Sequence, residues 1–412
     1  MSYHDHHFHP FGYAATLTGL EVYESRSIDD LRKRLADHAE RTDGAVIAER
    51  LNDERLAEGR LPTAADLDEA VRDRPVLVYR YCGHIAVANT AALGLAGVSA
   101  GTPDPVGGSF DRGPDGAPTG VLRETAIDVV AARVADHVAP TLDSEIIEAL
   151  STLPKMGIDS VTAILSPGEP LWVGVEDEIG TLVRLAPDLP IAVDVLVATR
   201  DPQELTDAAH RLATAEGPVR FHGWKDFSDG SFGGHTAAMY EAYFDRPETT
   251  GTVRLDHARA IEMGFTSYKL GGIVAIHAIG DLANDMVLDV MEELIKRGVH
   301  PESTRIEHAS IMTPAAIERM ARLGVTASVQ PAFIASEEDW LEKRLGPERM
   351  EMVYPFRSFL DAGIPMVGGS DAPVEHPDPR PAIQAAVERK GFNTEEALTR
   401  EEAEALFSPP NR

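Results

Sequence analysis

The sequence predicts an α/β fold, a closed (β/α)8 barrel that takes up the whole chain, residues 1–412, as a single domain. The chain contains eight short apolar runs that are rich in β-branched residues and bounded by Gly, Pro or charged residues, as β-strands are. Helix-like stretches, with apolar residues at three- and four-residue spacing, lie between them. With 43% hydrophobic side chains, the chain can also bury a large core. Alternating β and α units form parallel sheets, and eight such units close into a barrel.

Each element follows from its local pattern. Strands are predicted at about residues 2–8, 159–165, 190–197, 218–227, 272–277, 303–308, 325–330 and 364–371. Helices are predicted at DLANDMVLDVMEELIKRG and TPAAIERMARLG, each with Gly just past its end. The second of these begins with Thr313 as the N-cap and Pro314 at the first helical position.

About 150 residues between the first two predicted strands do not follow this alternation of strands and helices. They include two helix-like pieces (SIDDLRKRLADHAERT and AADLDEAVRD), a strand-like VLVYRY and a Gly/Pro/Asp-rich stretch at 101–120. We predict that residues 10–150 are an insertion that covers the catalytic face of the barrel. His84, Asn89, Arg123 and Glu124 in this segment are candidates for substrate contact, and the alternative is that they cap loops and helices.

The amino-acid composition indicates which partners, which cellular location and which metal ligands to expect. The net charge of −29, from 67 acidic and 38 basic residues, argues against a nucleic-acid partner. The sequence shows neither an apolar run of roughly 20 residues nor a basic segment followed by an apolar signal core. We therefore expect a soluble cytoplasmic protein that does not bind a membrane. The single Cys82 excludes an internal disulfide framework and a thiolate cluster, so His and carboxylate groups are the available metal ligands.

Polar side chains at the ends of predicted strands are candidates for a metal site. His7 and His9 lie in HDHHFHP, and the two-residue period of a strand puts both on one side. His277 in AIHAIGD and His308 in RIEHAS end consecutive βα units, and active sites of such barrels lie at the C-terminal ends of strands. Asp371, in GGSDAP, closes the last strand.

These residues also have structural alternatives. His-rich N-termini are often tag remnants, a lone His at a strand end is often a hydrogen-bonded structural residue, and Asp371 before Ala-Pro suits a turn cap. Lys225, in RFHGWKDFSDGS, is on this view a surface lysine or the partner of Asp226. A dication repels a protonated ammonium, so a lysine in a metal site must lie away from the metal, lose its proton or be chemically altered.

Taken together, the motifs resemble the amidohydrolase superfamily. They are D-x-H-x-H at 5–9, K-x-F-x-D-G-S at 225–231, H-A-I-G-D at 277–281, R-I-E-H-A at 305–309 and G-S-D-A-P at 369–373. Within the superfamily the chain looks most like the family 3 amidohydrolases, which include N-substituted formamide deformylases. EGRLPTAADLDEAV, YCGHIAVANTAAL, GVLRETA and LTREEAEAL agree, so the resemblance covers nearly the whole chain.

The resemblance implies a barrel of the metal-dependent hydrolase type, with two divalent metals, zinc first and manganese or iron as alternatives. The implied ligands are His7, His9 and Asp371 for the more buried metal and His277 and His308 for the second, with a Lys225 carbamylated by carbon dioxide as the bridge. A metal-bound hydroxide would cleave a C–N bond of an amide or formamide other than a peptide. Asp371 would carry the proton, so Asp371, Lys225 and His308 are the expected catalytic residues.

The same resemblance suggests roles around this centre. His84 or Gln330 would help to hold the oxyanion, and Ser231 and His235 would lie near the pocket. Glu307 and Asp281 are candidates to orient the ligands, with Glu307 acting on His308 indirectly, because adjacent strand residues point to opposite sides.

Relatives usually carry a small β-sandwich built from both chain ends. Here Met1 comes only a few residues before His7 and the chain stops at SPPNR, so we expect the sandwich to be largely absent, through trimming, a misassigned start or a natural barrel-only form. Two other functions stay open. One is a mononuclear deaminase of a cyclic amidine, which needs no bridging lysine, and the other is a catalytically impaired barrel that acts as a binding protein. The expected partner is a small amide-like molecule. Barrels of this kind often form homodimers, and the sequence identifies neither the substrate nor the oligomeric state.

Overall fold

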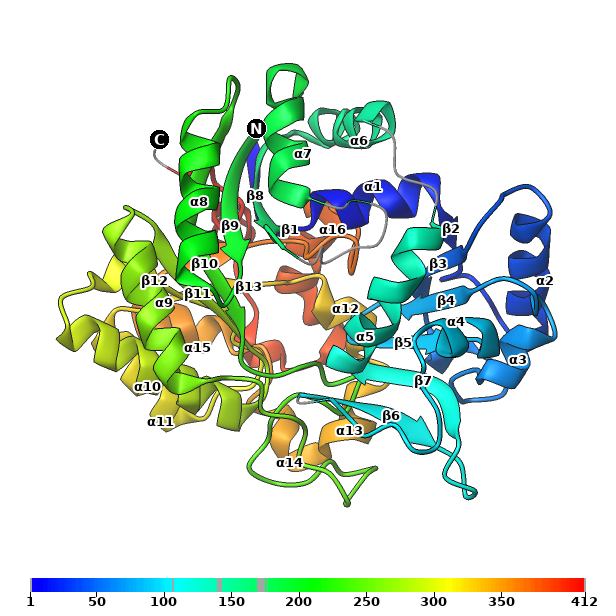
Figure 1. The fold of residues 1–412 in the computed structure, drawn as a ribbon. Helices are drawn as coiled ribbons and strands as arrows, with labels where there is room; N and C mark the ends of the chain where they lie inside the picture. Colours follow the sequence, from blue (N-terminus) through cyan, green and yellow to red (C-terminus); the bar gives the residue numbers. More distant parts are fainter. Residues whose placement is uncertain (1, 106, 139–142, 169–174, 176, 411–412) are drawn as a thin grey trace. The chain divides into compact units, whose positions relative to one another are not determined.

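The computed structural model describes residues 2–105, 107–138, 143–168, 175 and 177–410, and these form two compact units (Figure 1). The first unit holds the described residues of Met1–Pro10, Ile146–Leu171 and Asp177–Arg412. The second holds those of Phe11–Glu145 and Trp172–Glu176, and so begins within the segment predicted as an insertion. Of that predicted segment, residues 106 and 139–142 lie outside the described residues.

The first unit contains the predicted eight-stranded parallel barrel. Its strands are β1 (Tyr3–Phe8), β8 (Ile158–Leu165), β9 (Ala192–Ala198), β10 (Val219–Phe227), β11 (Ile273–Ala278), β12 (Thr304–His308), β13 (Thr326–Val329) and β14 (Met366–Gly368). They pair in this order, each parallel to the next. A parallel bridge between Phe8 and Ala372 brings the two end strands together, so the barrel is nearly closed. Each strand overlaps a predicted one, which confirms this part of the fold.

Helices follow the strands along the chain. In and beside the first unit they are α6 (Asp143–Leu150), α7 (Glu178–Leu185), α8 (Pro202–Ala213), α9 (His257–Lys269), α10 (Asp281–Lys296), α11 (Pro314–Leu323), α12 (Phe333–Glu337), α13 (Leu341–Leu345), α14 (Pro347–Met350), α15 (Phe356–Asp361), α16 (Pro379–Glu388) and α17 (Arg400–Ala405). Helices α8 to α11 lie side by side on the outside of the barrel (Figure 1). Among the helices that the structure describes, none is both long and apolar enough to cross a membrane.

Helix α11 illustrates how local sequence sets these boundaries. The Thr313 side chain accepts a hydrogen bond from the backbone N–H of Ala316, and Pro314 occupies the first helical position, as predicted. The helix ends at Leu323, and the C-cap residue Gly324 has a left-handed φ of 71°. Glycine adopts this conformation without steric cost, and its N–H satisfies carbonyls of the last turn. The chain then turns directly into β13.

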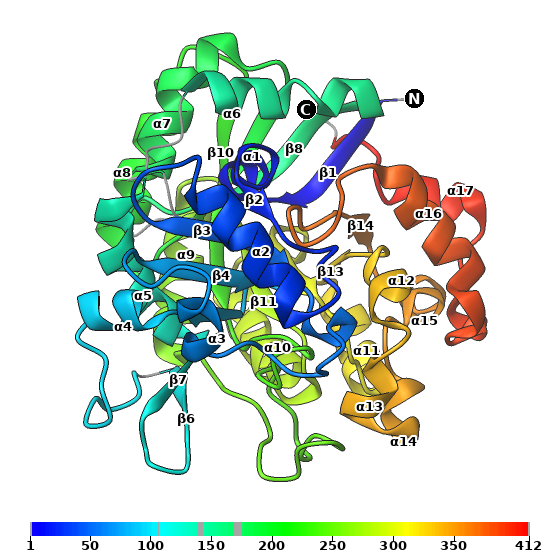
Figure 2. The same ribbon diagram turned by 90° about the vertical axis from the view of Figure 1, so that its right-hand side faces the viewer.

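The second unit is built on a mixed six-stranded sheet (Figure 2). Its strands pair in the order β2 (Leu20–Glu21), β3 (Val46–Leu51), β4 (Val76–Arg80), β5 (Ile85–Ala88), β7 (Pro118–Glu124) and β6 (Gly108–Arg112). The helices within its residues, together with the one that leads into it, are α1 (Pro10–Thr18), α2 (Ile28–Ala39), α3 (Ala64–Asp68), α4 (Thr90–Leu95) and α5 (Thr125–Val134). Along β4, Val76 and Val78 belong to one core cluster and Leu77 and Tyr79 to another. Successive side chains of a strand point to opposite faces, so this sheet is covered on both faces.

Glu49, on β3, gives the second unit a pH-dependent stability. Its side chain is buried, and burial raises its pKa from 4.5 to about 8. Between these values the folded state holds a proton that the unfolded state has lost. Stability therefore falls as the pH rises through this interval, by up to about 1.4 kcal/mol per pH unit.

We expect Glu49→Gln, which is neutral at every pH, to lose this dependence and to be more stable than the wild type at about pH 8. Urea unfolding of both proteins between about pH 5 and about pH 8 measures the difference. Glu40→Gln, at an exposed position after α2, is the matched control and should keep the wild-type slope. An unchanged slope in Glu49→Gln would contradict the assignment.

Candidate metal centre

Three of the predicted ligands meet where the first and last barrel strands come together. The ligand atoms of His7, His9 and Asp371 all lie within 4.8 Å of one another, and the three residues are buried. One carboxylate oxygen of Asp371, Oδ1, is 3.2 Å from Nε2 of His7 and 3.2 Å from Nε2 of His9. His7 lies in β1 and His9 directly follows its last residue, and the two-residue period of the extended chain directs both to one side. Two imidazoles and a carboxylate are a suitable ligand set for a divalent ion.

Backbone contacts hold these groups together. The Asp371 N–H donates to the carbonyl of His7 at 2.8 Å. Asp5, two residues before His7, accepts from the N–H of His7 at 3.1 Å and from the N–H of Ser370 at 2.9 Å. Its second oxygen accepts from the Ser370 hydroxyl at 2.5 Å. The aspartate of the D-x-H-x-H motif therefore ties β1 to the turn that carries Asp371.

His308 and His277 extend the group along neighbouring strands. The ring centroid of His308 lies 4.9 Å from that of His7 and 4.5 Å from that of His277. Burial, together with the neighbouring His277, lowers the pKa of His308 well below its usual range. This imidazole is therefore neutral at pH 7, which is the form that binds a metal.

Hydrogen bonds select one tautomer of each of these rings. Nδ1 of His308 lies 2.7 Å from Oε1 of Gln330, and Nε2 of His277 lies 3.0 Å from the carbonyl oxygen of Gly230. Amide and carbonyl oxygens only accept hydrogen bonds, so these two nitrogens carry the protons. The lone pairs that remain are on Nε2 of His308 and Nδ1 of His277. We expected Gln330 to help to hold the oxyanion. In the structure its side chain is hydrogen-bonded to His308, a candidate metal ligand.

Glu307 orients His7, and not its chain neighbour His308 as expected. Its Oε2 lies 2.7 Å from Nδ1 of His7, and its Oε1 accepts from Nε of Arg305 at 2.5 Å. Burial alone would raise the pKa of Glu307, but the charges of Arg305 and His7 lower it well below its usual range. Burial alone would likewise lower the pKa of His7, whereas Asp371 and Glu307 raise it to about 9. The negative charges of Asp371 and Glu307 therefore favour a positive charge at His7. When no metal is bound, this charge is a proton on the imidazole.

Lys225 is buried on β10 and is not a surface residue, with an exposed fraction of 1%. Its Nζ lies 3.6 Å from the ring centroid of Phe227 and 3.3 Å from the carbonyl oxygen of Asp226. The Asp226 carboxylate is bonded instead to Arg200, at 3.1 Å. Burial lowers the pKa of Lys225 to about 8, and its charge acts on His308. A substantial fraction of the amine is therefore neutral near physiological pH.

Two of the ligand candidates have left-handed backbones. The φ angle is 73° at His308 and 59° at Asp371, and the following Ala309 has a φ of 45°. This region is uncommon for residues other than glycine and costs on the order of 1–3 kcal/mol per residue. Strain of this kind persists only where surrounding contacts impose it, and it clusters at functional sites.

The segment after β10 holds Ser231 and His235, both expected near the pocket. The Ser231 hydroxyl accepts from the N–H of Gly234 at 3.1 Å, and the Ser231 N–H donates to the Thr236 hydroxyl at 3.0 Å. Nε2 of His235 lies 3.1 Å from a carboxylate oxygen of Asp245. These contacts stabilise the segment itself, and substrate contact by either residue stays a prediction.

His84 and Asn89 lie in the second unit, on either side of β5. The Asn89 side chain accepts from the backbone N–H groups of Val76 at 3.0 Å and Ala92 at 2.9 Å, and its amide also donates two hydrogen bonds. Asn89 is thus the N-cap of α4, which was the alternative interpretation. Nδ1 of His84 lies 2.9 Å from Oε2 of Glu124, and a substrate contact by His84 stays a prediction.

Comparisons with known proteins show the family of this chain. The model of the amidohydrolase family, in its family 3 form, matches residues 4–409. The putative amidohydrolase YtcJ of Bacillus subtilis (strain 168) is 32% identical over 412 residues, which is 98% of this chain and 75% of that protein. The N-substituted formamide deformylase of Arthrobacter pascens is 26% identical over 365 residues, 86% of this chain and 67% of that protein. The crystal structure of an uncharacterized metal-dependent hydrolase from Pyrococcus horikoshii OT3 superposes with a TM-score of 0.74 at 30% identity, covering 98% of this chain and 78% of that one.

The family match and the related solved structure identify a metal-dependent hydrolase that uses a divalent ion. The chain belongs to the amidohydrolase family, as the sequence motifs predicted.

Proposed function

We propose that this protein hydrolyses the C–N bond of a non-peptide amide or formamide and that it works with two divalent metals. The observation that carries the proposal is the cluster of His7, His9 and Asp371, whose ligand atoms lie within 4.8 Å of one another in buried surroundings. His308 and His277 continue this cluster, at ring distances of 4.9 and 4.5 Å. Their tautomers leave one nitrogen lone pair on each ring for a second ion.

Lys225 is the proposed bridge between the two ions. Its amine is buried and its pKa is about 8, so a neutral fraction is available to react with carbon dioxide. A bond forms between Nζ and the carbon of carbon dioxide, and one proton leaves to solvent. The product is a carbamate, which places a carboxylate at the end of a long side chain. Such a group suits zinc, and also manganese or iron.

Bound divalent ions would supply Lewis acidity and lower the pKa of a water molecule toward ~7. Burial alone would raise the pKa of Asp371, but its contacts with His7 and His9 hold that pKa well below its usual range. Asp371 is therefore ionised at neutral pH and can accept a proton from the attacking water. It then returns the proton to the leaving nitrogen. Burial and the neighbouring His277 lower the pKa of His308 well below its usual range, so His308 is neutral at pH 7 and available as a ligand.

The Arthrobacter pascens relative is an N-substituted formamide deformylase, and this supports formamides as the first compounds to screen. Its identity of 26% leaves the acyl and amine groups open, so the screen should contain N-formyl and N-acyl amines of varied size. Release of formate or carboxylate together with an amine would identify the reaction. Release of ammonia from a cyclic amidine would identify the deaminase instead.

Metal content per chain tests the proposed centre. We expect about two zinc ions in wild-type protein expressed with added zinc and bicarbonate, and one or fewer in Lys225→Ala, because the bridging carboxylate is lost. Elemental analysis of the desalted proteins measures both. Lys269→Ala is the matched control, since Nζ of Lys269 also lies over a phenyl ring, 4.4 Å from the centroid of Phe265, but at an exposed position of α9.

Each other outcome has a definite meaning. One zinc ion in both the wild type and Lys225→Ala would contradict the bridged centre and favour a mononuclear deaminase. A folded wild type that holds no metal and hydrolyses none of the compounds would contradict the hydrolase and favour a binding protein. Loss of metal from Lys269→Ala would show that the assay reports general damage.

A further inference from the structure

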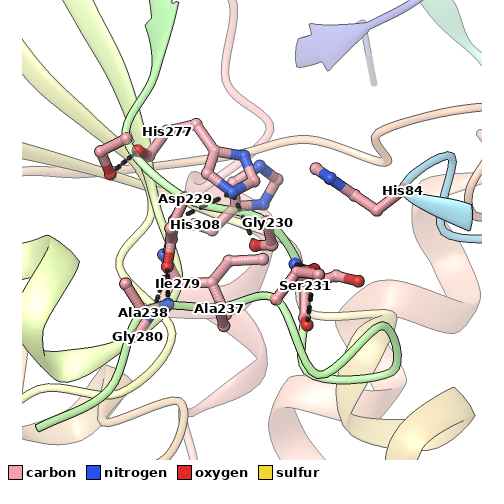
Figure 3. A network of polar contacts seen from close by, with 12 residues as sticks. His84, Asp229, Gly230, Ser231, Ala237, Ala238, His277, Ile279, Gly280 and His308 are labelled. Atoms are coloured by element: carbon pink, nitrogen blue, oxygen red, sulfur yellow. Dashed lines mark hydrogen bonds and ion pairs between the residues drawn. The ribbon is translucent and has the colours of Figure 1, made fainter. Parts of the chain in front are cut away.

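Asp229 lies two residues after β10, and none of the proposed catalytic steps uses it. Its side chain is fully buried, with an exposed fraction of 0%. Its Oδ2 accepts from the N–H groups of Ala238 at 2.9 Å and Gly280 at 2.8 Å, and its Oδ1 accepts from the N–H of Ile279 at 3.1 Å (Figure 3). One carboxylate thus joins the segment 228–238 to the start of α10.

The same carboxylate faces a predicted metal ligand. Oδ1 of Asp229 lies 3.3 Å from Nε2 of His277, the nitrogen that donates to the Gly230 carbonyl at 3.0 Å (Figure 3). The Ser228 N–H donates to the backbone carbonyl of His277 at 3.0 Å. Three consecutive residues, 228–230, therefore hold both the backbone and the ring of His277. The negative charge of Asp229 stabilises a proton on Nε2 and keeps the lone pair on Nδ1.

Close packing of the backbone at Gly280 and Ala238 restricts the movement of segment 228–238. A Cβ atom at Gly280 would lie 1.9 Å from the carbonyl oxygen of Ala238, so only glycine permits the two backbones to approach this closely. The N–H of Gly280 is one of the three that bond Asp229. A displacement of the segment 228–238 would therefore move the carboxylate, the Gly230 carbonyl and the His277 ring together.

We propose that Asp229 is a positioning residue: it sets the tautomer of His277 and couples the packing of segment 228–238 to the metal affinity of that histidine. The part that concerns metal affinity rests on the proposed function, whereas the part that concerns the tautomer does not. The competing explanation is that Asp229 only fastens backbone and that its distance to His277 is incidental. The two explanations differ in what happens to the His277 ring.

The experiment combines a tautomer measurement with metal titration. In wild-type protein freed of metal and labelled with ¹⁵N-histidine, long-range ¹H–¹⁵N spectra show which ring nitrogen carries the proton, and the His277 signals are those absent from His277→Gln. We expect the proton on Nε2 in the wild type. In Asp229→Asn we expect a mixture of tautomers, because the loss of the carboxylate that holds segment 228–238 displaces the Gly230 carbonyl from Nε2. Competition with a chelator should show about 10- to 100-fold weaker binding of the zinc ion that is also lost in His277→Gln.

Asn284→Ala is the matched control. Nδ2 of Asn284 donates to the carbonyls of Ile279, Gly280 and Ile311, at 3.3, 2.8 and 3.2 Å, so it fastens the same backbone through bonds that do not involve His277. We expect this variant to lose stability and to keep the wild-type tautomer and zinc affinity.

A wild-type His277 with its proton on Nδ1 overturns the proposal even if Asp229→Asn does not fold. An unchanged tautomer in folded Asp229→Asn, or the same losses in Asn284→Ala, also overturns it. If the protein binds no zinc at all but the tautomer still follows Asp229, the proposed function fails and the positioning role stands.

Discussion

Asp371→Asn will reduce kcat/KM for any amide or formamide that the wild type hydrolyses by about a thousandfold, because an amide oxygen cannot accept and return a proton. The substituted side chain has the same shape and can still accept hydrogen bonds from His7 and His9, so the fold should be retained. The measurement is steady-state kinetics on the best compound of the screen. Asp361→Asn, which changes an exposed carboxylate at the end of α15, should keep wild-type activity.

Elemental analysis of Asp371→Asn separates proton transfer from metal loss. If the variant keeps both zinc ions and is inactive, the missing function is the proton carrier. If it loses one ion as well, Asp371 acts also as a ligand, which the resemblance to the family implies. A variant that retains activity within about tenfold of the wild type would remove Asp371 from the mechanism.

Glu307→Leu will cause a large loss of stability, because it removes one partner of a buried ion pair. Glu307 has an exposed fraction of 0% and lies between Arg305, at 2.5 Å, and His7, at 2.7 Å. Removal of one partner leaves the buried Arg305 charge uncompensated, which costs about 3–5 kcal/mol. Urea unfolding at neutral pH measures the loss, and Glu302→Leu, at an exposed position before β12, should change stability by less than about 0.5 kcal/mol.

A double variant identifies the cause of that loss. In Arg305→Met with Glu307→Leu, both charges are gone and apolar side chains of similar volume replace them. Such replacements of buried ion pairs are often neutral or stabilising, so we expect the double variant to recover a large part of the stability. A double variant as unstable as Glu307→Leu alone would show that packing, and not the buried charge, causes the loss.

The barrel strands could be predicted from sequence because each is a short apolar run with clear boundaries. The predicted run at 303–308, for example, becomes β12 with all five of its residues buried, as strands covered on both faces are. His7 and His9 could be placed together because strand periodicity is fixed by covalent geometry. The convergence of strand ends at one edge of a parallel barrel then brought His277, His308 and Asp371 into the candidate site.

The partners of these ligands could not be predicted in the same way. Strand alternation puts Glu307 and His308 on opposite sides, yet the left-handed φ of 73° at His308 breaks the alternation at that residue. A backbone conformation of this kind is imposed by tertiary contacts and leaves no mark in the residue types. For the same reason the K-x-F-x-D-G-S motif contained Asp229 but did not show which backbone groups it binds.

Most strands of the second unit could not be predicted from sequence, for a different reason. Only VLVYRY had a clear strand pattern, and it forms β4, whose residues are all buried. Strand β2 has two residues and β6 is only partly buried, so neither has the apolar alternation that marks a strand in sequence. Short edge strands of this kind are recognised from their pairing partners.

The junction between β1 and the turn after β14 has a consequence for biosynthesis. The hydrogen bonds between Asp5 and Ser370 join residues 365 positions apart. The strand β1 therefore leaves the ribosome long before Ser370 has been synthesised. Closing a loop of that length costs about 5 kcal/mol of chain entropy, which makes this junction the natural last step in assembly of the ring. His7 and His9 stand on one side of the junction and Asp371 on the other. Metallation is therefore expected only after residue 371 has been synthesised, and an ion held by these three residues would stabilise the closed barrel.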